Sequence, residues 1–148
     1  MKEKVGIVDP GGRGHTLAKK YAESDEVGEI FIFPGREYMQ HGIDKPVNTF
    51  PHLKTTSVID ILNICEEQGM SLVDVAQDNA VEIGLVDVLE EAGIPVVGPT
   101  REAGRIEWDK VWARKFMEKY DIPHPKFKVC NSQQDGVEFT THMKIKNG

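Results

Sequence analysis

The sequence predicts an α/β protein built around a parallel sheet. Short apolar runs alternate with segments of helical periodicity, and most of the runs end at a glycine or a proline. Strands that alternate with helices pair in parallel through right-handed crossovers, which gives a Rossmann-like sheet. Ligands of such sheets bind beyond the carboxyl ends of the strands. We therefore expect the functional residues in the loops that follow the strands, at 9–15, 34–38, 76–79 and 98–101.

The apolar pattern assigns each element of this sheet. Strands are expected at 5–8, 29–33, 72–75 and 94–97, with a further short strand near residue 47. Helices are expected at 16–23, at 58–68 and along the apolar stripe from 81 to 92.

The character of the chain changes after residue 103. Four aromatic residues recur every fourth position on one helical face, which is typical of core packing: Trp108, Trp112, Phe116 and Tyr120. A strand at 126–129 and a helix at 133–143 are expected to follow. The chain therefore reads as one domain, residues 1–103, and the beginning of a second, residues 104–148.

Composition narrows the class of protein. The chain has 148 residues, 39% of them hydrophobic, so it can bury an ordinary core. A formal net charge of −6 argues against bulk nucleic-acid binding, which uses a basic face. The two cysteines form neither a disulfide framework nor a zinc motif. No apolar run approaches the ~18 residues of a membrane span, so we expect a cytoplasmic protein without a membrane partner.

The Gly-rich loop, residues 9–15, is the strongest functional signal. Gly11 and Gly12 lie between a strand and a helix, where backbone N–H groups can approach a phosphate and the helix N-terminus adds positive charge. Arg13 can add a bidentate contact. The loop matches neither the dinucleotide fingerprint nor the P-loop, and no acidic residue follows the second strand. We predict a phosphate site here; a tight turn without a ligand is the alternative.

Other strand-end residues have two possible roles each. His15 can donate to a phosphate or cover the first turn of its helix. Pro34 and Gly35 can bring a second backbone edge to the same crevice or form an ordinary turn. Asp78 and Asn79 can accept hydrogen bonds from ribose hydroxyls or cap a helix. The sequence shows no metal-ligand spacing and no nucleophile–base arrangement, so we assign no catalytic residue and no metal ligand.

Taken in order, these motifs resemble the amino-terminal part of the phosphoribosylamine–glycine ligase family. The resemblance covers residues 4 to about 130. The motifs that carry it are residues 11–15, 34–35, 85–87, 98–100, 107–110, 113–117 and 122–123. Residues 1–103 then resemble the Rossmann-like pre-ATP-grasp domain of that family, which binds the phosphosugar. Residues 104–148 resemble the truncated beginning of its ATP-grasp domain.

The resemblance implies an ATP-dependent carbon–nitrogen ligase of purine biosynthesis, which joins glycine to 5-phosphoribosylamine with ATP and Mg²⁺. The implied substrate-binding residues are Gly11, Gly12, Arg13, His15, Pro34, Gly35, Asp78 and Asn79. Lys110 is the implied ATP contact. A further strand lysine, a Gly-rich lid and late carboxylates for Mg²⁺ are not found before Gly148. We therefore expect the chain alone to be inactive and to bind neither cofactor tightly, with its ATP-grasp portion separate or missing.

Two other functions are compatible with the sequence. The first is a stand-alone module that binds a phosphosugar or nucleotide without catalysis, and the second is an NAD-binding Rossmann domain. The chain also departs from the family pattern, in which Glu, Asn, Gly-Pro-Glu and Ser are usual at the positions of Gly14, Arg36, Ala76-Gln77-Asp78 and Asp109. These departures are typical of a divergent branch and affect the geometry of the ligand site.

Overall fold

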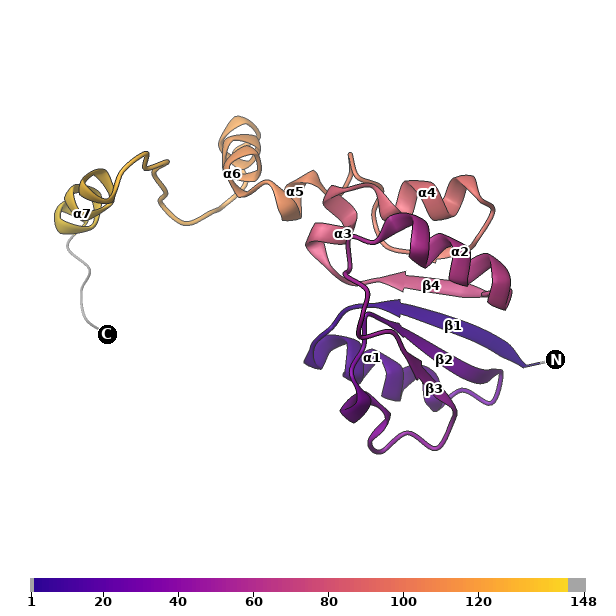
Figure 1. Ribbon diagram of the computed structural model, residues 1–148. Helices are drawn as coiled ribbons and strands as arrows, with labels where there is room; N and C mark the ends of the chain where they lie inside the picture. The colour runs from indigo at the N-terminus through magenta and orange to yellow at the C-terminus, as the bar shows by residue number, and fades with distance from the viewer. Residues whose placement is uncertain (1, 144–148) are drawn as a thin grey trace. The chain divides into compact units, whose positions relative to one another are not determined.

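The computed structural model describes residues 2–143, which form two compact units, one ending at Trp108 and the other beginning at Asp109. The first unit holds a five-stranded, all-parallel sheet with helices on both faces, as Figure 1 shows. The predicted α/β fold with a parallel sheet is therefore confirmed.

The sheet has the strand order β3-β2-β1-β4-β5. From β1 the chain passes through α1 to β2 and β3, and α2 then returns it to the other side of β1, where β4 pairs. The order therefore reverses between β1 and β4, and such a switch point opens a crevice at the strand ends. The elements are β1 (Glu3–Val8), α1 (Gly12–Ala22), β2 (Val27–Phe33), η1 (Glu37–Gln40), β3 (Val47–Thr49), α2 (Val58–Gln68), β4 (Leu72–Val75), α3 (Asp78–Glu82), α4 (Leu85–Glu91) and β5 (Val96–Val97).

Two apolar layers enclose the sheet because successive strand residues point to opposite faces. In β2, Ile30 and Ile32 pack on the side of α1, whereas Phe31 and Phe33 pack on the side of α2 and α4. Phe50 stacks on Phe33 with ring centroids 4.9 Å apart and extends the second layer. These layers fix the carboxyl ends of β1 and β4 from both sides.

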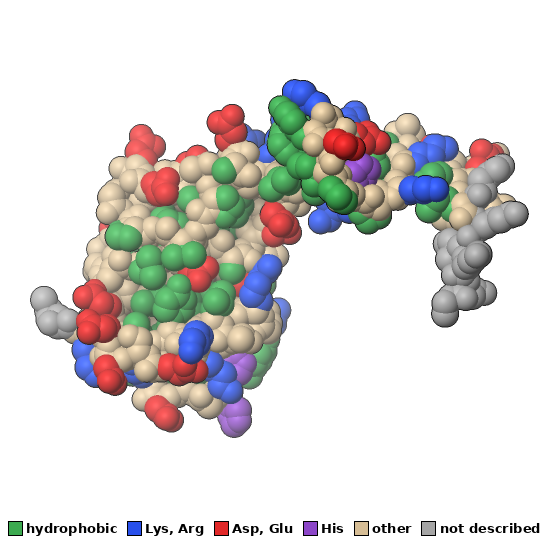
Figure 2. All heavy atoms as spheres, turned by 180° about the vertical axis from the view of Figure 1, so that it is seen from behind, with side chains coloured by type: hydrophobic (Ala, Val, Ile, Leu, Met, Phe, Trp, Pro, Cys, Tyr) green, Lys and Arg blue, Asp and Glu red, His purple; other side chains and the backbone are tan. Residues whose placement is uncertain are grey.

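The cover of the α1 face is incomplete. Helix α1 contacts β1 and β2, whereas β5 has its helical contact with α4 on the opposite face. Val97 of β5 is consequently 47% exposed. Seen from behind, hydrophobic side chains gather in the middle of the first unit's surface with charged side chains around them (Figure 2).

Local backbone conformation explains where the expected helices differ from the observed ones. Helix α1 begins at Gly12, four residues before the expected start at 16, because the Gly-rich loop itself forms the first turn. The helix expected at 81–92 is two helices, α3 and α4, because Gly84 adopts a left-handed φ of 82° between them. The expected end of α2 is confirmed by Gly69, which caps it in the left-handed conformation with φ 64°.

The aromatic repeat after residue 103 is divided between the two units. Trp108 ends α5 (Arg105–Trp108) and packs against the core of the first unit. Asp109 caps α6 (Lys110–Lys119) by accepting a hydrogen bond of 2.9 Å from the Trp112 amide. Phe116 stacks on Trp112 at 5.0 Å, but Tyr120 is 55% exposed. Core packing is therefore the right interpretation for Trp108 and the wrong one for Tyr120.

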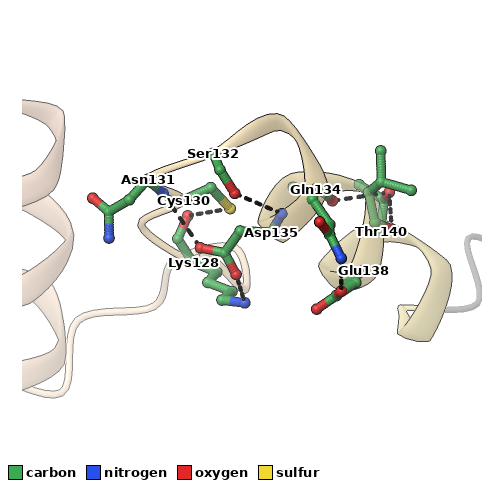
Figure 3. A network of polar contacts seen from close by, with 10 residues as sticks. Lys128, Cys130, Asn131, Ser132, Gln134, Asp135, Glu138 and Thr140 are labelled. Atoms are coloured by element: carbon green, nitrogen blue, oxygen red, sulfur yellow. Dashed lines mark hydrogen bonds and ion pairs between the residues drawn. The ribbon is translucent and has the colours of Figure 1, made fainter.

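The segment before the last helix is irregular. No strand forms at 126–129, contrary to the sequence prediction, because this segment pairs with no other strand of the described chain. Instead, Lys128 forms an ion pair with Asp135 of α7 (Gln133–His142), and Ser132 caps that helix at 3.1 Å from the Asp135 amide (Figure 3). The hydrogen bond between Lys128 and Asp135 lowers the pKa of the Asp135 carboxyl and raises the pKa of the Lys128 ammonium group. Side-chain contacts with the helix thus take the place of strand pairing.

Candidate functional site

The loops that follow β1 and β4 meet at the switch point of the sheet. Here the end of β4 and its loop line a cavity of about 250 Å³, together with Arg13 at the start of α1, Pro99 after β5, and residues of α3 and α5. Its walls combine one cation, two carboxylates and an apolar side, formed by Arg13, Val75, Ala76, Gln77, Asp78, Val81, Pro99, Glu107 and Trp108. Among the predicted site residues, the structure brings Arg13 and Asp78 together here. Gln77, Glu107 and Trp108 were not predicted.

The Gly-rich loop is folded around a carboxylate of its own. Asp9 is 2% exposed, and its Oδ1 accepts hydrogen bonds from the amides of Gly11 at 2.7 Å and Gly14 at 3.0 Å. Helix α1 begins at Gly12, so the amides of Gly12 and Arg13 lie in its first turn. No acceptor for these two amides occurs among residues 2–143. Of the amides of Gly11, Gly12, Arg13 and Gly14, two are therefore available to an anion, those of Gly12 and Arg13.

Arg13 is fixed along one edge of its guanidinium group. Its Nε donates to Asp9 Oδ2 at 2.9 Å, and its Nη2 donates to Gln77 Oε1 at 2.8 Å. For Nη1 the described part of the chain supplies no acceptor. The side chain is 56% exposed. The outer edge of the guanidinium group is therefore accessible to a ligand in the cavity.

A polar pair with one buried member, Asp74, and one half-buried member, Tyr21, links α1 to β4. The Tyr21 hydroxyl donates to Asp74 Oδ2 at 2.9 Å. Burial raises the pKa of the Asp74 carboxyl, although the Tyr21 hydrogen bond and the nearby Arg13 charge both favour its ionised form. Burial, reinforced by Asp74, raises the pKa of Tyr21 to about 12. In the sequence, Asp74 is recognisable as an acidic residue within an apolar strand run, but the sequence does not reveal Tyr21 as its partner.

The family of the chain follows from its sequence over this whole unit. Residues 3–107 match the family described as phosphoribosylglycinamide synthetase, N domain. The chain belongs to this family. The matched region ends within α5, so it includes the switch point and every residue that lines the cavity except Trp108.

Curated relatives agree with the phosphoribosylglycinamide synthetase match. The phosphoribosylamine–glycine ligase of Archaeoglobus fulgidus is 30% identical over 148 residues, and that of Pyrococcus horikoshii is 34% identical over 133 residues. These alignments cover 98% and 89% of this chain but 31% and 30% of the relatives. The chain thus spans about 31% of the length of the Archaeoglobus fulgidus ligase.

Solved structures share the fold at low identity. The biotin carboxylase domain of a single-chain bacterial carboxylase has a TM-score of 0.63 at 13% identity, covering 96% of this chain and 34% of that one. The biotin carboxylase subunit of pyruvate carboxylase has a TM-score of 0.59 at 18% identity, covering 97% and 33%. These similarities support the fold assigned to the chain.

Three predicted residues lie next to a second, shallower cavity near the end of β2. His15 Nε2 lies 3.0 Å from the backbone oxygen of His41. Pro34 follows β2 and accepts a backbone hydrogen bond of 2.6 Å from Phe50, while Gly35 adopts a left-handed φ of 62°. This cavity, of about 770 Å³, is lined by Arg36, Glu37, Tyr38, Gln40, His41 and Pro51. The structure therefore does not bring His15, Pro34 and Gly35 into the cavity of Arg13.

The remaining predicted residues have distinct environments. Asn79 Oδ1 accepts a hydrogen bond of 2.8 Å from the buried Thr55 hydroxyl, so this amide anchors the chain before α2. Gln77 is the N-cap residue of α3, and neither Asp78 nor Asn79 caps that helix. Lys110 is the exposed first residue of α6 in the second unit.

The described residues also bear on metal binding and membranes. Among residues 2–143, no group of three or more His, Cys, Asp or Glu side chains is arranged to hold a metal ion. The described side chains therefore form no metal centre of their own, and we derive no step through Mg²⁺. Within the same range, the helices are too short or too polar to cross a membrane.

Proposed function

We propose that this chain supplies the phosphoribosyl-binding part of an ATP-dependent ligase that joins glycine to 5-phosphoribosylamine in purine biosynthesis. The observation that carries the proposal is the cavity at the β1/β4 switch point, where Arg13, Gln77 and Asp78 converge. Ligands of open parallel sheets bind at this position. The family match and the named relatives support the choice of substrate.

Each end of the substrate has a complementary group in this proposal. The 5-phosphate accepts from the amides of Gly12 and Arg13 and from the outer guanidinium edge, which are anion-binding groups. The Asp78 carboxylate accepts hydrogen bonds from ribose hydroxyls. Trp108 and Pro99 provide an apolar wall against the sugar. Gly11 and Asn79 act indirectly in this proposal, because their hydrogen bonds to Asp9 and Thr55 hold the two loops in place.

His15, Pro34 and Gly35 lie outside this cavity, and we propose that they act at the outer edge of the substrate site, next to the end of β2. In a ligase that includes an ATP-grasp portion, Lys110 would contact ATP, which with Mg²⁺ would supply the phosphoryl group that activates glycine. Phosphoryl transfer of this kind depends on positioning and on neutralisation of charge. We expect the present chain by itself to hold the phosphosugar without completing the ligation.

Isothermal titration calorimetry with D-ribose 5-phosphate, D-ribose and NAD tests the proposal. Binding of ribose 5-phosphate well above that of ribose is expected, because the phosphate contributes charge-assisted hydrogen bonds of about 1–3 kcal/mol. Arg13→Ala should remove most of this difference. Tight binding of NAD with none of ribose 5-phosphate would overturn the proposal.

A second assay separates the ligase part from a stand-alone binding module. The chain is incubated with ATP, glycine and freshly generated phosphoribosylamine, with and without a homologous ligase whose own amino-terminal domain has been removed. Restored formation of glycinamide ribonucleotide supports a ligase part. Phosphosugar binding without any restoration supports the module.

A further inference from the structure

Arg13 is held by two residues that are not among the predicted ligand contacts. Asp9 binds Nε at 2.9 Å and Gln77 binds Nη2 at 2.8 Å. In a planar guanidinium group these two nitrogens form one edge, and Nη1 with Nη2 forms another that is free for bidentate contact. The two partners therefore occupy the inner edge and leave the outer one for an anion.

Asp9 is a rigid anchor, unlike the partner of an ordinary surface ion pair. Its side chain is 3% exposed, and its other oxygen is held by the amides of Gly11 and Gly14. The carboxylate therefore cannot follow the arginine by changing rotamer. An ion pair to a fixed partner immobilises the flexible side chain at the one position that the partner allows.

Gln77 brings the second loop into the same arrangement. It follows β4, is the N-cap residue of α3 and makes no capping hydrogen bond with its side chain. That side chain bonds Arg13 across the switch point, 64 residues away in the sequence.

We propose that Asp9 and Gln77 are positioning residues that fix Arg13 for a phosphate or carboxylate group in the cavity. An arginine that is already immobilised in the free protein spares the ligand the loss of its rotamer entropy. The Gly11 and Gly14 amides already donate to Asp9 and are not available to a ligand. The anion is therefore bound at the rim of the Gly-rich loop, by the Gly12 and Arg13 amides and the outer guanidinium edge. This inference rests on the proposed phosphosugar site.

A double-mutant cycle on the whole chain tests the proposal, with D-ribose 5-phosphate as the probe and calorimetry as the readout. Asp9→Asn keeps an oxygen for the two amides but turns an N–H toward Arg13, and Gln77→Leu keeps the side-chain size without the acceptor. Each should lower the affinity about tenfold, the scale of one charge-assisted hydrogen bond. Gln68→Leu, a remote substitution of the same kind, should leave it unchanged.

The decisive measurement repeats these substitutions in an Arg13→Ala background. There, Asp9→Asn and Gln77→Leu should have no further effect, because the side chain through which they act is gone. Equal losses with and without Arg13 would overturn the positioning role. The positioning role would also be overturned if Arg13→Ala reduced the affinity and Asp9→Asn and Gln77→Leu did not. That result would leave the proposed phosphosugar site intact. Failure of the folded wild-type chain to bind ribose 5-phosphate would overturn both proposals.

Discussion

A Cβ atom on Gly14 would lie 2.5 Å from the backbone carbonyl oxygen of Asp9 and 3.0 Å from its Cβ. The first distance is shorter than real Cβ contacts, and the obstacle is backbone, which cannot move aside as a flexible side chain can. A side chain with a Cβ atom at this position is therefore incompatible with a loop that closes on Asp9. The glycine at position 14 is thus linked to the carboxylate that the loop encloses.

Gly14→Ala should consequently destabilise the protein. Relief of the contact requires the loop to open, and strain of this kind costs about 1–3 kcal/mol. Gly12→Ala is the matched control in the same helical turn, because a Cβ there meets nothing within 4 Å. It should be neutral or stabilise by about 0.4–1 kcal/mol through the unfolded state. Urea unfolding of both variants measures the difference, and equal stabilities would contradict the steric account.

Asp74→Asn should raise the free energy of unfolding at pH 7. Burial raises the pKa of Asp74, so the folded protein binds this proton more readily than the unfolded chain does. The ionised carboxylate therefore opposes folding, and its cost grows as the pH rises through the folded-state pKa. Asparagine keeps an acceptor for the Tyr21 hydroxyl and removes the charge.

The pH dependence distinguishes this cause from altered packing. The excess stability of Asp74→Asn should shrink as the pH falls toward 3.8, the ordinary pKa of the carboxyl, where wild-type Asp74 is also protonated. Urea unfolding at a series of pH values provides the measurement, with the exposed Asp60→Asn as control. An excess that is independent of pH would show that the charge is not its origin.

The repetitive elements of the fold were predictable from the sequence because they depend on local patterns. Short apolar runs marked β1 and β4, and Gly69 marked the end of α2. The break at Gly84 was missed, since the apolar stripe continues on both sides of it and only the backbone conformation divides the helix.

The candidate site was predictable only in part. Arg13 and Asp78 follow strands that the pattern identifies, so topology alone places them at one edge of the sheet. Gln77 lies in the same predicted loop as Asp78, but its bond to Arg13 depends on tertiary packing between segments far apart in the chain. The same is true of the position of Trp108, and no local pattern records either contact. The Asp9 carboxylate was missed for a different reason: an aspartate after a strand is common, and its inward rotamer follows from the conformation of the loop.

The two cysteines should differ sharply in their reactivity toward a thiol reagent. Cys65 is fully buried in α2, and burial raises the pKa of its thiol to about 12. Cys130 is exposed. Because the thiolate is the reactive form and needs access, the folded protein should react at Cys130 alone. Titration with Ellman's reagent should give one fast thiol, and two in denaturant; loss of the fast phase in Cys130→Ser assigns it, and fast labelling of Cys65 would contradict the structure.

Thr55 and Asn79 should stabilise the fold as a coupled pair. Thr55 is 6% exposed, and its hydroxyl donates to Asn79 Oδ1 at 2.8 Å, joining the segment before α2 to α3. Thr55→Val and Asn79→Ala should each lower the free energy of unfolding by about 1 kcal/mol, the net value of one hydrogen bond. The double variant should lose clearly less than the sum of the two, because either substitution already breaks the shared bond. Additive losses would contradict the pairing.

The affinity for ribose 5-phosphate then separates the two possible roles of Asn79. If Asn79 only anchors the segment before α2, Thr55→Val and Asn79→Ala should have equal affinities. If Asn79 contacts the sugar directly, only Asn79→Ala should have a lower affinity.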